Sequence, residues 1–317
     1  MNKIKIMPQV TVYKDMLSES QIDFLMKEIL ESQKEIQEIE KTAPEMSAYF
    51  DLHGTQPKDR EDQTLIYTWT PWYTFGLRSI WSDPRDSRNK KEHVEGYNII
   101  KNIIADVHDD YMNDYKENGR WTYDISDWDI MAPENEDHTN MPLSTFEILQ
   151  HRLNKEEDYT IGVHTDWHDH RKDEPGPKQI LTYTIYLNDE YEGGEIDFVD
   201  EETDHVIAYK PKKGDVTVFP SGKPYWHGAR AVKSDPSKIF IRTFAIYRSP
   251  GSKEWNNGIK VNGVTQWVAM QNEIIKDYID KGNVGRQLVF PGQEPKEDAN
   301  LVPLYVKKET YIDGRTI

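Results

Sequence analysis

The sequence predicts a mainly β fold, a sandwich or jelly roll, with helices flanking it. The first observation is a run of eight short strand-like segments between residues 142 and 248, rich in β-branched and aromatic residues. The second is that turn-forming pairs separate them, among them Asn188-Asp189, Gly193-Gly194 and Ser221-Gly222. Many short strands with frequent turns are typical of two packed sheets.

The helices are expected at the two ends of the chain. Ser18 and Gln21 form a capping-box pattern, and apolar residues at helical spacing follow it. A second helix is predicted over about 91–116 and a third over about 264–280, ended by Gly282. The eight strands are expected at residues 142–153, 158–167, 178–188, 194–200, 205–210, 215–220, 225–232 and 238–248. We therefore expect a mainly helical first third, and a last 35 residues that are extended and loop-like.

No repeat or low-complexity linker divides the chain. We expect one integrated domain in three parts. Residues 1–141 form a helical and loop N-terminal region that wraps or covers the core, residues 142–250 form the catalytic β core, and residues 251–317 form a C-terminal helix and an extended tail. The aromatic segment 67–81 and the loop 168–178 are candidates for lid and specificity elements.

Composition excludes several classes of function. The 317 residues include no cysteine, which removes disulfides, thiolate metal sites and cysteine nucleophiles. The net charge of −17 disfavours binding to nucleic acid. There is no apolar run near the length of a membrane span and no signal-peptide pattern, so we expect a cytoplasmic protein without a membrane partner.

The chemistry is expected around His164-Thr-Asp166. Residues i and i+2 of a strand point to the same face, so His164 and Asp166 can offer two neighbouring metal ligands. His227, at the start of a later strand, is the best third ligand. Two histidines and one carboxylate on one face of a metal leave positions open, which is typical of nonheme Fe(II) oxygenases. His168 and His170 lie in an expected loop and are not predicted as ligands.

The open positions can take a bidentate 2-oxo acid and then O2. The far carboxylate of such an acid needs a cation. Lys238 and Arg242 are four residues apart on the last predicted strand and therefore share a face. Of the neighbouring residues, Trp226 is expected to pack away from the site, and His151 and Arg230 are expected at the surface.

These pieces together resemble a known family. After the HxD pair come Leu181-Thr-Tyr-Thr-Ile-Tyr186-Leu-Asn188, the Gly193-Gly194 turn, Gly214-Asp215 before a Phe-Pro strand, His227-Gly, and the Lys238/Arg242 strand. The order resembles the 2-oxoglutarate/Fe(II)-dependent dioxygenases in their prolyl-4-hydroxylase-like branch. It is also similar to uncharacterised hydroxylase-like proteins of marine phages and bacteria. The likeness covers residues 142–248 and leaves both flanks unmatched.

The resemblance implies a double-stranded β-helix of the cupin-like, jelly-roll kind. It implies Fe(II) on His164, Asp166 and His227, with 2-oxoglutarate and O2 as co-substrates. The oxoglutarate tail would bond Tyr186, with Thr184 on the same face. Lys238 is 11 residues after His227 and Arg242 is 15 residues after it; Arg242 is favoured as the main anchor because arginine grips a carboxylate bidentately, with Lys238 second.

The function implied is hydroxylation of an unactivated C–H, with succinate and CO2 as co-products. The substrate is a prolyl-like residue of a peptide, a free amino acid or another small molecule. Two alternatives stay open: a non-catalytic metal- or sugar-binding jelly roll, and a cupin-type metal hydrolase or isomerase. The sequence determines neither the substrate nor the oligomeric state.

Overall fold

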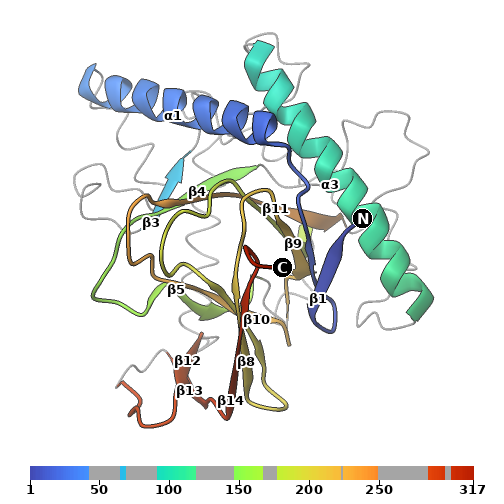
Figure 1. Ribbon diagram of the computed structural model, residues 1–317, viewed down its shortest axis with the longest axis vertical. Coiled ribbons are helices and arrows are strands. Elements are labelled where there is room, and N and C mark those ends of the chain that lie inside the picture. Colours follow the sequence, from blue (N-terminus) through green and yellow to red (C-terminus); the bar gives the residue numbers. More distant parts are fainter. Residues whose placement is uncertain are drawn as a thin grey trace.

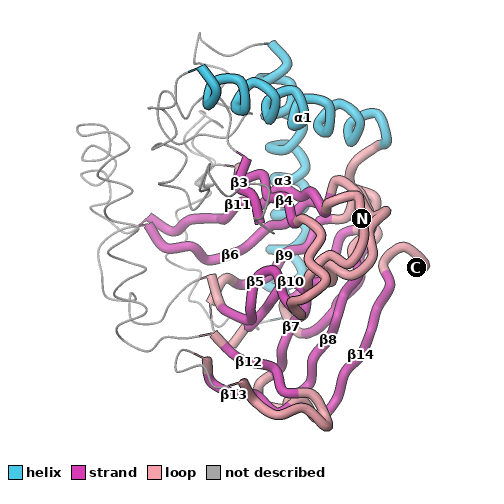
Figure 2. The backbone as a smooth tube through the Cα atoms, turned by 90° about the vertical axis from the view of Figure 1, so that its left-hand side faces the viewer, coloured by secondary structure: helices cyan, strands magenta, loops and turns pink. Residues whose placement is uncertain are grey.

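The computed structural model describes residues 1–42, 65–68, 91–118, 146–166, 177–222, 224–248, 285–296 and 301–317. In this part of the chain, two curved sheets lie face to face and two long helices cover one of them (Figures 1 and 2). The helix predicted over 264–280, most of segment 67–81 and most of loop 168–178 lie outside the described residues. So do the predicted domain boundaries near 141 and 250, which stay predictions.

Eight strands build the core. They are β4 (Glu147–His151), β5 (Tyr159–His164), β6 (Pro177–Tyr186), β7 (Ile196–Asp200), β8 (His205–Lys210), β9 (Val216–Pro220), β10 (Trp226–Arg230) and β11 (Lys238–Arg248). Strands β9-β6-β11-β4 form the middle of one sheet, and β5-β10-β7-β8 form the middle of the other. All six pairings are antiparallel. Consecutive strands thus alternate between the sheets, except that β7 and β8 form a hairpin within the second sheet, as in a double-stranded β-helix, and the predicted fold class is confirmed.

Further strands extend both sheets at their edges. The first sheet gains β1 (Lys3–Met7) and β2 (Val10–Tyr13) beside β9, and β3 (Leu65–Thr68) beside β4. The second sheet gains β12 (Arg286–Val289) and β13 (Val302–Tyr305) beside β5, and β14 (Lys308–Asp313) beside β8. The expectation of a mainly helical first third therefore missed three strands. The C-terminal tail is extended, as expected, but it pairs with the core instead of forming only loops.

Two helices cover the outer face of the first sheet. Helix α1 (Glu19–Thr42) begins after the predicted cap, where the Ser18 backbone N–H donates to Gln21 Oε1 at 2.9 Å. Helix α3 spans Lys91–Asn118. The apolar stripes of both helices and the outward side chains of β6, β9 and β11 form one buried cluster. Neither described helix is long and apolar enough to cross a membrane.

One buried ion pair joins both ends of the chain to the core. The Lys14 Nζ lies 2.8 Å from Asp215 Oδ2, and it also donates to the Gly314 carbonyl at 2.6 Å and to the Tyr209 hydroxyl at 3.2 Å. The lysine follows β2, the aspartate precedes β9, and the glycine follows β14. Because all three donors of the ammonium have acceptors, this charge is buried without an unmet hydrogen bond.

Candidate metal centre

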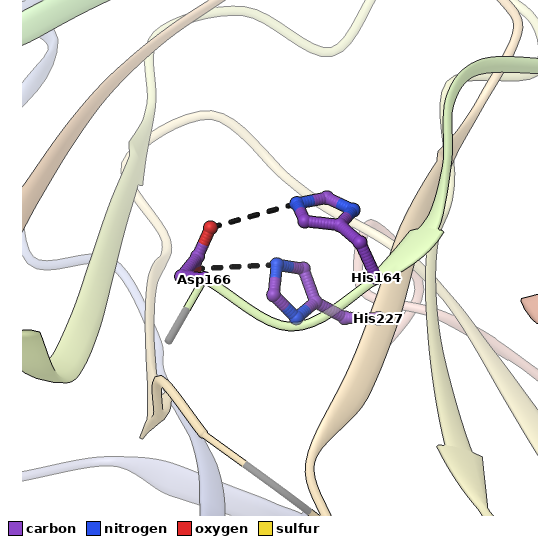
Figure 3. Close-up of side chains that lie close together, drawn as sticks. All are labelled: His164, Asp166 and His227. Carbon is purple, nitrogen blue, oxygen red and sulfur yellow. Dashed lines mark ion pairs between the residues drawn. The ribbon is translucent and has the colours of Figure 1, made fainter. Parts of the chain in front are cut away.

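Three side chains converge inside the barrel at the ends of β5 and β10 (Figure 3). His164 is the last residue of β5 and lies directly across from His227 on β10. Asp166 lies two residues beyond the end of β5, so this strand is shorter than the range of 158–167 that the sequence predicted. Asp166 Oδ1 lies 3.5 Å from His164 Nε2, and Asp166 Oδ2 lies 3.4 Å from His227 Nε2. One potential ligand atom from each residue lies within 4.8 Å of the others, so the three could hold a metal ion.

The backbone orients both imidazole rings for this task. His164 Nδ1 lies 2.7 Å from the Gly162 carbonyl, and His227 Nδ1 lies 3.4 Å from the Tyr225 carbonyl. A carbonyl only accepts hydrogen bonds, so Nδ1 carries the proton in each ring. The Nε2 lone pairs are therefore the ones that face Asp166. This arrangement of a carbonyl behind each imidazole is typical of histidine metal ligands.

The carboxylate of Asp166 is buried and fixed by a residue that sequence reasoning missed. Thr182 Oγ1 donates to Asp166 Oδ2 at 2.7 Å and lies 2.9 Å from Ser221 Oγ. Burial opposes ionisation of Asp166, but His227, His164 and Arg242 outweigh it and hold its pKa well below the usual range. A sequence signal for Thr182 existed, because it precedes the predicted Thr184 by two residues on the same strand face.

Desolvation also keeps a ligand lone pair available on the second histidine. Burial lowers the pKa of His227, with a further contribution from His164, although Asp166 opposes the shift. The imidazole is thus neutral near pH 7, as a metal ligand must be. The Phe219 ring packs against it edge-on, with the ring centroids 4.6 Å apart.

A pocket runs from this cluster into the barrel. Its wall includes His164, His227 and all four residues that the sequence proposed for oxoglutarate, namely Thr184, Tyr186, Lys238 and Arg242. Leu149, Ile161, Ile196, Phe219 and Phe240 supply apolar surface. The free volume is about 40 Å³, little more than one water molecule occupies. A larger ligand therefore requires side chains in the wall to move.

The two candidate cations lie at different ends of the pocket. Arg242 lies beside the triad, with Nη1 3.8 Å from Asp166 Oδ1, and its side chain is 17% exposed. Lys238 lies four residues earlier on the same face of β11, far from Asp166 along the strand. Its Nζ is 5.1 Å from the ring centroid of Tyr186 and donates to the Gly194 carbonyl at 2.7 Å. Lys238 and Tyr186 thus form one cluster, and Arg242 and Asp166 form another.

Lys238 is a cation with unused donors. It is 1% exposed, and among the described residues its only hydrogen-bond acceptor is the Gly194 carbonyl. Burial lowers its pKa to about 7, with a further contribution from Lys210. The neighbouring Tyr186 hydroxyl is buried and has no hydrogen-bond partner in the described part of the chain. Burial raises the pKa of this phenol, so it stays protonated and can donate.

Three neighbouring residues test the expectations about surface and packing. His151 is fully buried, so its expected place at the surface was wrong; it is the last residue of β4 and faces Lys238 across the sheet. Arg230 is also not a plain surface residue, because its Nε bonds the buried Asp197 at 2.9 Å. Trp226 packs in a buried cluster with Val163 and Leu288, away from the triad, as expected.

A larger cavity, of about 280 Å³, is lined by Tyr159, Arg230 and Phe290, among others, and by none of the triad. The Arg230 guanidinium in its wall is already paired with Asp197 and Glu309. We therefore do not assign the reaction to this cavity.

Comparisons with known proteins agree with the site. Residues 149–246 match the family model of the 2OG-Fe(II) oxygenase superfamily. No curated protein sequence matches the chain. Among solved structures, the chain is similar to an oxidoreductase of the 2OG-Fe(II) oxygenase family from Burkholderia pseudomallei (19% identity, TM-score 0.25), over 32% of this chain and 43% of that protein.

Two further solved structures to which the chain is similar are prolyl hydroxylases. The viral collagen prolyl hydroxylase of Paramecium Bursaria Chlorella virus-1 is 17% identical, with 76% of this chain and 97% of that one covered and a TM-score of 0.40. A prolyl-4-hydroxylase of Pseudomonas putida is 10% identical, with 76% and 94% covered and a TM-score of 0.35. These TM-scores are too low to support an assignment to a branch, so the prolyl-4-hydroxylase-like branch stays a prediction.

The matched segment spans β4 to β11 and contains the three convergent side chains, the pocket and both cations. Members of the matched family use Fe(II), 2-oxoglutarate and O2. Residues 149–246 match the 2OG-Fe(II) oxygenase superfamily, so the resemblance that the motifs indicated is confirmed for this segment at the level of the superfamily.

Proposed function

We propose that the chain hydroxylates an unactivated C–H of a peptidyl residue, prolyl-like in character, or of a free amino acid or other small molecule. In this reaction one oxygen atom of O2 enters the substrate as an alcohol. The other enters succinate, which forms from 2-oxoglutarate with loss of CO2. The observation that carries the proposal is the placing of His164, Asp166 and His227 at one end of a pocket whose other end holds Lys238 and Tyr186.

The residues fit iron by their chemistry. Two imidazoles with Nε2 directed at an ionised carboxylate supply the two-histidine, one-carboxylate set that suits Fe(II). All three ligands lie on one side of the site, because both histidines belong to neighbouring strands and Asp166 follows one of them. Thr182 and the two backbone carbonyls restrict the ligands to this arrangement.

The residues also fit oxoglutarate, and the contacts favour Lys238 over Arg242 as the anchor of its distal carboxylate. A buried ammonium with one acceptor and a buried hydroxyl with none are two donors that a carboxylate would satisfy. Thr184 lies between the two ends of the pocket, across from Arg242 in register, and could contact the chain of the acid. Arg242 lies beside the metal ligands and would face the proximal end.

When bound, iron and oxoglutarate supply the oxidation of the C–H bond by O2. The chain's own residues supply geometry and a dry environment. Lys238 and Tyr186 would hold one end of the co-substrate, and His164, Asp166 and His227 would hold the metal at the other end of the pocket. Leu149, Phe219 and Phe240 exclude water from the pocket.

Anaerobic titration with Fe(II) and oxoglutarate tests the proposal. We expect a weak visible charge-transfer band that develops only when both are present, because it requires the acid to chelate the metal. We then expect succinate release in air, stimulated by the correct substrate among candidate peptides and amino acids. A chain that binds metal but no oxoglutarate would contradict the proposal and favour a cupin-type hydrolase or isomerase. A chain that binds neither would favour a non-catalytic jelly roll.

A further inference from the structure

His151 is the most unusual polar residue near the pocket. It is fully buried, and neither Nδ1 nor Nε2 has a hydrogen-bond partner among the described residues. A neutral imidazole carries one donor and one acceptor, so two hydrogen-bonding positions are unmet inside the protein. Leaving buried polar groups unmet is unfavourable, and such groups in a native structure call for an explanation.

The position of His151 on β4 points it into the barrel. His151 and Leu149 are two residues apart on β4, so their side chains point to the same face, and Leu149 lines the pocket. On the neighbouring strand β11, Lys238 lies directly opposite His151. Its ring packs edge-on against Phe240, with the centroids 4.9 Å apart. His151 does not itself line the pocket, but Lys238 and Phe240 do. It therefore lies directly behind the end of the pocket that holds the lysine.

The hydrogen-bonding capacities of His151 and Lys238 match. The ammonium has three donors, and Gly194 uses one of them. The ring has a lone pair without a donor, and a cross-strand pair brings the two side chains to the same face. Burial, with the charges of Lys238 and Arg242, lowers the pKa of His151 well below its usual value, so the ring is neutral and keeps that lone pair.

We propose that His151 is a positioning residue for the distal carboxylate of the co-substrate. When the co-substrate binds, the neutral imidazole would accept one donor of Lys238, a hydrogen bond that the two side chains do not form in this structure, and would so direct the ammonium toward a carboxylate bound beside Tyr186. The inference rests on the proposed function, because it assumes that oxoglutarate binds in this pocket. The inference goes beyond the proposed function, because it gives a role in co-substrate selection to a histidine that is neither a metal ligand nor part of the pocket wall.

The experiment uses two acids that differ only at the distal end. 2-Oxoglutarate and 2-oxopentanoate have the same five-carbon chain and the same chelating end, but the second lacks the distal carboxylate. Binding of each to the Mn(II)-loaded 317-residue chain is measured by calorimetry for the native sequence, His151→Leu and His151→Gln. His108→Leu is the matched control, since His108 is also buried but bonds Tyr183 on the opposite face of the sheet.

We expect His151→Leu to weaken oxoglutarate binding about tenfold, which is the effect of one lost hydrogen bond, and to leave 2-oxopentanoate binding unchanged. His151→Gln keeps an acceptor and should recover much of the difference, whereas His108→Leu should not alter the preference between the acids. Equal weakening of both acids in His151→Leu, or no weakening at all, would overturn the inference. Failure of the native chain to prefer oxoglutarate would instead overturn the proposed function.

Discussion

Two buried lysines of this protein differ in how many hydrogen-bond acceptors surround them. Lys14 and Lys238 are both almost completely buried. Lys14 has a carboxylate, a hydroxyl and a carbonyl as acceptors, and it connects the two ends of the chain. Lys238 has one carbonyl among the described residues and faces a pocket. The same side chain is thus completely partnered in one place and incompletely partnered in the other.

Under the proposed function, Lys14 is a structural charge and Lys238 is a binding charge. A buried charge is tolerated when hydrogen bonds and an opposite charge compensate its desolvation. At Lys14 the protein supplies that compensation itself. At Lys238 part of it is missing, and the lysine responds with a pKa lowered to about 7 by burial and by Lys210. An anionic ligand would complete the second site as Asp215 completes the first.

The largest expected effect is at the metal end, where the polar groups are partnered by the protein. Replacing Asp166 by Ala removes the carboxylate that both histidines face. We expect metal binding, the charge-transfer band and succinate formation all to disappear. The metal-free protein should also unfold at a lower temperature near pH 7, because the interactions that lower the pKa of Asp166 stabilise the folded state and are lost. Retention of the charge-transfer band would show that Asp166 is not a ligand.

The next effect tests the structural lysine. Lys14→Met leaves Asp215 buried without its counter-charge. We expect a loss of about 3–5 kcal/mol in the free energy of unfolding, measured by denaturant titration. Lys212→Met is a suitable control, because that lysine forms a more exposed ion pair with Asp15 and should contribute no more than about 1 kcal/mol. Similar losses in the two variants would contradict the distinction between them.

The binding lysine should behave in the opposite way. Lys238→Met should leave the free energy of unfolding unchanged or raise it, because an incompletely partnered charge gives way to an apolar side chain. Oxoglutarate affinity should fall about 100-fold, the scale of a lost charge-assisted hydrogen bond in a buried site. Arg242→Met, measured in parallel, decides between the two cations. A larger loss of oxoglutarate affinity in that variant would identify Arg242 as the distal anchor.

The strands of the core were predictable because each carries its own signal. All eight overlap their predicted ranges, since apolar alternation and turn pairs are local features of the sequence. The edge strands β1, β2 and β14 carry weaker signals. Each has four to six residues, and β2 and β14 are stabilised by pairing with β9 and β8, far away in the chain, while β1 joins the sheet through β2. Such pairing cannot be read from a short segment alone.

The residues of the site also include some that the sequence could predict and some that it could not. His164 and Asp166 were predictable from strand phase, and the motifs indicated His227. The burial of His151 was not predictable, because Gln150 and Arg152 on either side give a polar context. Only the pairing of β4 with β11 places that ring against Phe240 and Lys238. The choice between Lys238 and Arg242 also depends on tertiary structure, because both share one strand face in the sequence pattern.

The smallest effect concerns pH and tests the incomplete partnering of Lys238 directly. Because the pKa of the free site is about 7, Lys238 is protonated below this pH and loses its proton above it. Binding a carboxylate requires the ammonium, so above pH 7 binding must be accompanied by proton uptake. We expect oxoglutarate affinity to be nearly constant between pH 6 and 7 and to fall by about tenfold per unit above that.

Calorimetry in buffers of different ionisation enthalpy measures this proton uptake. Lys238→Arg is the informative variant, because arginine stays charged throughout the range and should make the profile flat. A native chain that binds without proton uptake at pH 8 would mean that Lys238 keeps its proton in the free protein. The lysine would then already have a compensating partner, and the contrast with Lys14 would be lost.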